Sequence, residues 1–169
     1  SREDLLGYCA LSANPVGRLV LHLHGIDDAR LLRQSDAICT ALQLINFWQD
    51  LSVDLPRGRV YVPNADLRAH RLGDDDLRDV SQAHRFVPLV RELCAWAEKL
   101  ICEGAPLARR VPGRGGWELR LVVQGGLRIL EKIAAMGYLT RRHRPTLSRS
   151  DAPRLLWRAV FDNVSRETP

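Results

Sequence analysis

Two aspartates, Asp50 and Asp54, lie four residues apart at the end of a stretch with strong helical periodicity. On a helical wheel, Gln43 and Asn46 fall on the same face as the aspartates, within a stripe about 80° wide. Carboxylate and amide oxygens are the ligands that Mg²⁺ prefers, and the ion keeps its other positions for water and phosphate oxygens. The stripe therefore predicts a magnesium site that holds a diphosphate and neutralises its charge as it leaves.

The spacing alone also fits a solvated helix face. Asp75 and Asp79 repeat it at a predicted helix start, where acidic side chains complement the helix dipole, so we assign them no chemistry. The histidines form no metalloprotease pattern with neighbouring acids, and the 4 cysteines form no C-x-x-C pair. We expect the cysteines to be buried free thiols in a reducing compartment.

Residues 43–63 are similar to the second aspartate-rich motif of squalene and phytoene synthases. That motif reads roughly Q-x-x-N-x-x-x-D-x-x-x-D, followed by an R-x-Y-x-P turn that here begins at Arg59. Residues 8–18 resemble the preceding helix of the family. The pairing of Ser-Ala-Asn-Pro at residues 12–15 with Asn-Phe-Trp-Gln-Asp at residues 46–50 is typical of one branch, the bacterial hopanoid-pathway hydroxysqualene synthases, and residues 118–130 and the Arg144-Pro145 pair also resemble that branch. The resemblance spans nearly the whole chain and implies the C-terminal part of an all-α, isoprenoid-synthase-type helical bundle.

The resemblance also implies an activity and a set of site residues. The expected reaction is Mg²⁺-dependent conversion of presqualene diphosphate to hydroxysqualene, in which diphosphate is lost and water captures the cation without NADPH. The implied residues are Asn46, Asp50 and Asp54 for the metal, Asp50, Asp54 and Tyr61 for catalysis, and Tyr8, Gln43, Gln49 and Arg59 for substrate binding. Arg59, Tyr61 and Tyr8 have plainer interpretations as a loop arginine and two packed tyrosines.

Gln49 departs from the pattern of the family members that perform the head-to-head condensation. Those members usually carry Arg beside the first aspartate of the motif. A neutral side chain holds diphosphate less strongly than an arginine would. We therefore interpret Gln49 as typical of a branch that converts presqualene diphosphate and does not perform the condensation that forms it.

Two other functions remain open at this point. The chain could belong to a sister enzyme that makes squalene or phytoene from farnesyl or geranylgeranyl diphosphate. It could instead be a catalytically silent helical fragment that binds a partner or a lipid surface. The family holds its metal ions with two aspartate-rich motifs, and the first of these has no counterpart before Tyr8. We therefore expect the chain to supply only half of the metal-binding residues. We expect this piece alone to bind Mg²⁺–diphosphate weakly and to have no turnover.

The elements that must position these residues all follow helical periodicity. We expect a single all-α unit over residues 1–169, the C-terminal portion of a larger domain, since the chain lacks an initiator Met and begins within a helical pattern. The predicted helices cover residues 4–23 with a break at Pro15, 29–51, 64–69, 73–103 with a bend near Pro88, 117–136 and 151–164. Within the fifth of these, Gly125 and Gly126 predict close helix packing.

The charge and hydropathy of the chain limit the classes of partner that it can have. The formal net charge is +5, and Arg supplies nearly all of the positive charge. This favours an anionic partner such as a prenyl diphosphate, while no pattern of basic and aromatic residues indicates nucleic acid. The sequence contains no stretch of 18 apolar residues, so it predicts no membrane span. We expect a cytoplasmic protein whose lipid substrates are compatible with peripheral contact at the inner membrane face; the sequence does not determine its oligomeric state.

Overall fold

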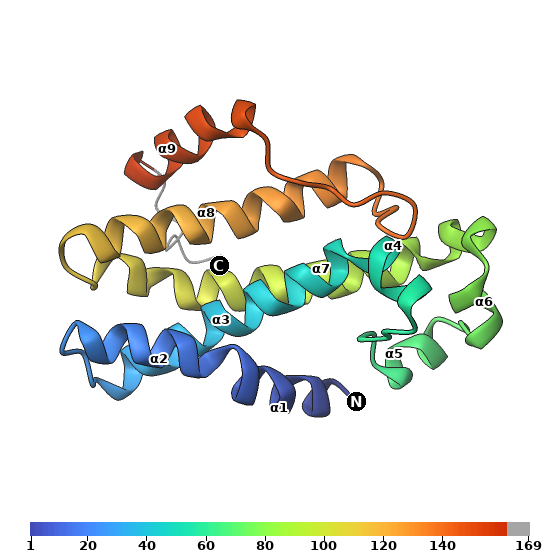
Figure 1. Cartoon of the computed structure of the whole chain (residues 1–169), viewed down its shortest axis with the longest axis horizontal. Coiled ribbons are helices and arrows are strands. Elements are labelled where there is room, and N and C mark those ends of the chain that lie inside the picture. The colour runs from blue at the N-terminus through green and yellow to red at the C-terminus, as the bar shows by residue number, and fades with distance from the viewer. Residues whose placement is uncertain (162–169) are drawn as a thin grey trace.

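The computed structural model describes residues 1–161, and every regular element in that range is helical (Figure 1). This confirms the all-α prediction. The α-helices are α1 Arg2–Ser12, α2 Asn14–Leu23, α3 Ala29–Gln49, α4 Leu51–Asp54, α5 Asn64–Ala69, α6 Asp74–Arg78, α7 Val87–Gly104, α8 Gly113–Ala135 and α9 Ala152–Phe161. The 3₁₀ helices are η1 Leu55–Arg57, η2 Val80–Phe86, η3 Ala105–Arg109 and η4 Arg149–Asp151.

Helix α3 is the central element of the bundle. It lies beside α7, with α1 and α2 on one side of this pair and α8 and α9 on the other (Figure 1). Its N-terminus is capped by Asp28, whose carboxylate accepts hydrogen bonds from the N–H groups of Arg30 and Leu31. Fully buried apolar side chains such as Leu44 and Trp48 then fix its orientation in the core. The opposite, polar face of α3 is thereby held towards the surface.

Glycine allows α8 to approach α3 and α7 closely. A Cβ atom on Gly126 would lie 2.7 Å from Cδ1 of Ile101 and 2.9 Å from Cδ2 of Leu42. These distances are shorter than ordinary carbon–carbon contacts, so a larger residue would require both neighbours to move. The prediction of close packing at this glycine pair is confirmed for Gly126.

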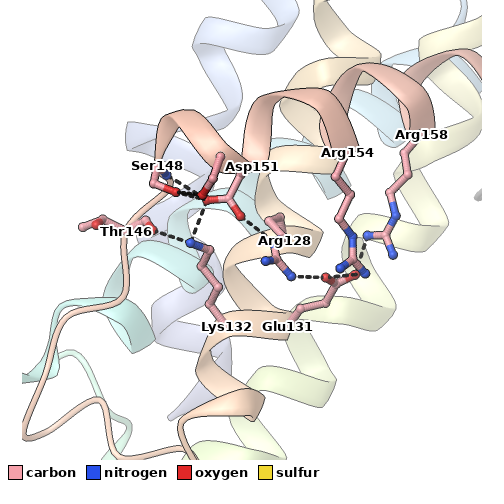
Figure 2. A network of polar contacts seen from close by, with 9 residues as sticks. Arg128, Glu131, Lys132, Thr146, Ser148, Asp151, Arg154 and Arg158 are labelled. Atoms are coloured by element: carbon pink, nitrogen blue, oxygen red, sulfur yellow. Dashed lines mark hydrogen bonds and ion pairs between the residues drawn. The ribbon is translucent and has the colours of Figure 1, made fainter.

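A network of ion pairs fastens α9 to α8 (Figure 2). Asp151 is buried and accepts from Arg128 Nε at 2.8 Å, Lys132 Nζ at 2.7 Å and the Ser148 N–H at 2.8 Å. The hydrogen bonds from Lys132, the Ser148 backbone and Arg128 hold the pKa of Asp151 well below its usual range. Close by, Glu131 forms ion pairs with arginines of both helices. The apolar side chains of α9 are mostly exposed, so these polar contacts are a major part of its attachment.

Several predicted boundaries differ from the structure. The single helix expected over residues 73–103 is wrong, because Asp79 has extended backbone (φ −90°, ψ 106°) and separates α6 from η2. Pro88 therefore lies in the first turn of α7, where its missing N–H costs nothing, and does not bend a longer helix. Helix α8 begins at Gly113, four residues before the predicted start at Trp117. The predicted end of the last helix, residues 162–164, lies outside the described residues.

Candidate functional site

Asp50 and Asp54 lie where α3 ends and the short helix α4 follows it. Asp50 has a backbone outside the helical range (φ −96°, ψ 10°), which interrupts the helix. Helical i to i−4 hydrogen bonds are nevertheless present on both sides of the interruption, from Asp50 N to the Asn46 carbonyl at 3.0 Å and from Asp54 N to the Asp50 carbonyl at 2.8 Å. The carboxylates consequently keep helical spacing, and both side chains are largely buried, at 16% and 13% exposed.

Each carboxylate of this face is paired with an arginine from another segment. Arg144, in the segment after α8, donates from Nε and Nη2 to the two carboxylate oxygens of Asp50, the second contact at 3.5 Å. Arg59 places Nη1 3.9 Å from Oδ1 of Asp54. Guanidinium groups bind phosphate with the same geometry as carboxylate. Both arginines could therefore exchange their carboxylate partner for a diphosphate bound here.

Arg144 is the site residue that the motif spacing could not reveal. It is separated from Asp50 by 94 residues, and no local periodicity connects the two positions. The only signal in the sequence was the resemblance of Arg144-Pro145 to one branch of the family.

Asn46 and Gln43 lie on the polar face of α3, before the two aspartates. Asn46 is exposed one turn before Asp50, and Gln43 is half-buried one turn earlier. Two carboxylates and an amide oxygen form a hard donor set that fits Mg²⁺. No cluster of three or more His, Cys, Asp or Glu side chains suited to a metal occurs among the described residues, so this face offers only part of a metal shell.

Gln49 lies on another side of the helix, away from the aspartate stripe. Its side chain is 8% exposed, and its Nε2 donates a hydrogen bond of 2.6 Å to the Pro145 carbonyl. This contact holds the segment that contains Arg144 against α3. The amide nitrogen of Gln49 is thus used within the chain, in a position to orient Arg144 towards Asp50.

An aromatic cluster connects α1, α3 and the turn after η1. Phe47 and Tyr61 are stacked with ring centroids 4.0 Å apart and an interplanar angle of 14°. Tyr8 lies 6.1 Å from Phe47 and 6.4 Å from Tyr61, and is 47% exposed. The structure therefore brings the predicted residues Tyr8 and Tyr61 together on Phe47. Aromatic faces of this kind stabilise a neighbouring cation.

An open apolar groove of about 390 Å³ begins beside the polar face of α3. Asn46 and Gln49 are its polar members. The remaining lining residues are apolar or glycine and come mainly from α3, α8 and α9: Leu42, Ile45, Leu121, Val122, Gly125, Gly126, Ile129, Leu147 and Leu155. The arrangement offers oxygen ligands and arginines close to a surface that can accept a hydrocarbon chain. No helix among the described residues has the length and hydropathy needed to cross a bilayer.

The sequence matches a known family over most of its length. A sequence profile described as squalene/phytoene synthase matches residues 1–151. The hydroxysqualene synthase of Sinorhizobium fredii is 34% identical over 135 residues, which are 79% of this chain and 45% of that protein. The phytoene synthase of Thermus thermophilus is 33% identical over 142 residues, 82% of this chain and 47% of that protein.

Solved structures agree with the sequence matches. The crystal structure of a squalene synthase from Alicyclobacillus acidocaldarius matches with a TM-score of 0.71 and 44% identity, over 82% of this chain and 52% of that chain. A dehydrosqualene synthase in complex with a ligand matches with a TM-score of 0.75 and 20% identity, over 94% of this chain and 56% of that chain, which shows the shared fold. The chain spans about half the length of the curated relatives and solved structures that it matches.

Proposed function

Because the chain belongs to the squalene/phytoene synthase family, we propose that it forms the second diphosphate-binding half of an enzyme that converts presqualene diphosphate to hydroxysqualene with Mg²⁺. The observation that carries this proposal is the pairing of Asp50 with Arg144 and of Asp54 with Arg59 at one end of a helix that also borders an apolar groove. Similarity to hydroxysqualene synthases favours this substrate over those of the condensing members.

The carboxylates and the arginines hold the diphosphate in different ways. Asp50, Asp54 and Asn46 are the residues that would hold Mg²⁺, which when bound draws charge from the departing diphosphate. Arg144 and Arg59 then bind phosphate oxygens in place of carboxylate oxygens, because their planar donor groups fit both. The carbon–oxygen bond to diphosphate breaks with the electron pair leaving on diphosphate.

The remaining residues of the site act on the organic part of the substrate. The apolar groove accepts the prenyl chain, and the partly exposed rings of Tyr8 and Tyr61 stabilise the carbocation. The Tyr61 hydroxyl donates a hydrogen bond near the leaving oxygen. Water then adds its oxygen to the cation and releases a proton, so the product is an alcohol and no reductant is consumed.

Mg²⁺ and diphosphate are expected to bind cooperatively. Mg²⁺ alone must compete with Arg144 and Arg59 for the carboxylates, and diphosphate alone is repelled by the same carboxylates. When both are added, the arginines and the carboxylates each gain a partner of opposite charge. Linkage requires that each ligand raises the affinity of the other by the same factor.

Calorimetric titration tests this expectation on the 169-residue chain. Diphosphate is titrated with and without Mg²⁺, into the native chain and into Asp50→Asn and Asp54→Asn. Asp75→Asn is the matched control, because Asp75 belongs to a second pair of aspartates four residues apart, at an exposed helix start. We expect weak, Mg²⁺-dependent binding that the first two variants lose and the control retains; equal loss in all three would contradict the site.

Product analysis tests the reaction. Presqualene diphosphate is incubated with the 169-residue chain, and with any longer chain that the gene encodes, in the presence of Mg²⁺ and with or without NADPH. We expect hydroxysqualene from the longer chain without NADPH and no turnover by the 169-residue chain. Squalene formed only with NADPH, or presqualene diphosphate formed from farnesyl diphosphate, would support a sister enzyme instead. Liposome binding that survives Asp50→Ala and Asp54→Ala, without any activity, would support a binding module.

A further inference from the structure

Arg141 is a buried cation that the proposed reaction does not use. It lies in the segment after α8 and is 4% exposed. Its guanidinium carbon is 4.8 Å from the centroid of the Phe86 ring. Two of its donor atoms, Nε and Nη1, are buried and have no hydrogen-bond acceptor among the residues that the structure describes. Burial lowers the pKa of this guanidinium from its ordinary value.

The carboxylates that act on Arg141 through space have other partners. Asp79 accepts hydrogen bonds from the N–H and the hydroxyl of Ser81, at 2.8 and 2.7 Å. Asp76 is ion-paired with Arg85 and also accepts from the Gly73 N–H at 2.9 Å. Neither carboxylate is hydrogen-bonded to the buried donor atoms of Arg141. A buried charge without a hydrogen-bonded partner is costly, so the guanidinium group of Arg141 favours a further anion nearby.

A cavity of about 350 Å³ adjoins Arg141. Its polar lining residues are Arg141, Arg78 and Ser52, and the others are apolar, among them Leu51 and Leu55. No carboxylate lines it within the described part of the chain, so Asp50 and Asp54 lie outside it. The lining thus combines two guanidinium groups and one hydroxyl with apolar side chains, a composition that favours an anion.

We propose that this cavity binds a small oxyanion of the phosphate class, with Arg141 and Arg78 as its cationic ligands and the Ser52 hydroxyl as a further donor. The planar donor fork of arginine matches the tetrahedral oxygens of phosphate. The Ser52 N–H donates to the Thr140 carbonyl at 3.1 Å, so the anion would contact α4 and the segment after α8 where they are already joined. The phosphate group can belong to a free ion or to the headgroup of an anionic lipid.

Calorimetry without divalent metal separates this site from the aspartate pair. Inorganic phosphate is titrated into the 169-residue chain at constant ionic strength, with Arg141→Met as the variant and Arg142→Met as the matched control, since Arg142 is an exposed neighbour. We expect one phosphate to bind with a Kd of about 1 mM or tighter. We expect Arg141→Met to weaken binding at least about tenfold and Arg142→Met to leave it unchanged.

Two further measurements keep the test decisive. If Arg141→Met does not fold, Val80→Trp replaces it, because Val80 is half-exposed at the cavity wall and a large ring there should block entry. Sedimentation with phosphatidylcholine vesicles containing phosphatidic acid distinguishes the lipid source, since binding that depends on Arg141 only with vesicles assigns the headgroup. Phosphate and vesicle binding that are both absent, or both insensitive to Arg141→Met and Val80→Trp, would overturn the proposal and leave Arg141 as a structural cation stacked on Phe86.

Discussion

Replacing Gln49 by Met tests whether this residue orients Arg144 or contacts substrate directly. The change removes the 2.6 Å hydrogen bond to the Pro145 carbonyl but keeps a side chain of similar length. Leaving a poorly solvated carbonyl without a donor costs about 1–3 kcal/mol, and the apolar Met recovers part of this. We therefore expect the free energy of unfolding to fall by about 1–2 kcal/mol. For a chain of this size, the Tm would fall by roughly 3–6 °C.

The control is the same substitution at Gln43, which is half-buried on the same helix. Thermal unfolding followed by circular dichroism gives the stability of both variants. Hydrogen exchange over residues 144–147 then reports whether the segment has loosened. We expect Gln43→Met to leave the thermal stability and the hydrogen exchange nearly unchanged. We expect Gln49→Met to increase exchange and to weaken Mg²⁺-dependent diphosphate binding through Arg144. If Gln49→Met weakens binding without changing stability or exchange, the positioning role is wrong and Gln49 is a direct substrate ligand.

Three further outcomes follow from the same contacts. Asp50→Asn and Asp54→Asn should each lower Mg²⁺-dependent diphosphate affinity by about tenfold or more in calorimetry, because each removes a charged metal ligand; unchanged affinity would contradict the assignment. The depressed pKa of Asp151 contributes stability that is complete above the unfolded pKa of about 4 and is lost as the pH falls further. Acid unfolding should therefore begin near pH 4 and be less steep in Asp151→Asn, as measured by fluorescence. Leu44→Ala, in the fully buried core, should cost about 2–5 kcal/mol in denaturant unfolding.

The helices whose ends carry local signals were predictable from the sequence. Helix α3 begins at Ala29 because Asp28 caps it, and α5 spans the predicted residues 64–69. The region around Asp79 was not predictable, because the break depends on how Asp79 caps the following turn and on how Phe86 is buried. Those are packing effects, and helical periodicity does not report them.

The candidate site was likewise only partly predictable from the sequence. Periodicity placed Asp50 and Asp54 on one face, and the hydrogen bond from Asp54 N to the Asp50 carbonyl spans one helical turn between them. The arginine that binds Asp50 comes from the far end of the chain, and its contact with Asp50 could be found only in three dimensions. The roles of Asn46, Tyr8 and Tyr61 stay predictions, although the structure places the two tyrosines in one aromatic cluster.

The position of Gln49 changes how its difference from the condensing members of the family should be understood. The sequence suggested that a neutral residue there removes a cation from a clamp on diphosphate. In the structure, this side chain instead faces the Pro145 carbonyl, next in sequence to the arginine that binds Asp50. An arginine at position 49 could also donate to that carbonyl, but it would bring a second positive charge towards Arg144. Glutamine supplies the hydrogen bond without the repulsion, so it leaves Arg144 paired with Asp50, and in the proposed function a diphosphate would compete for this arginine.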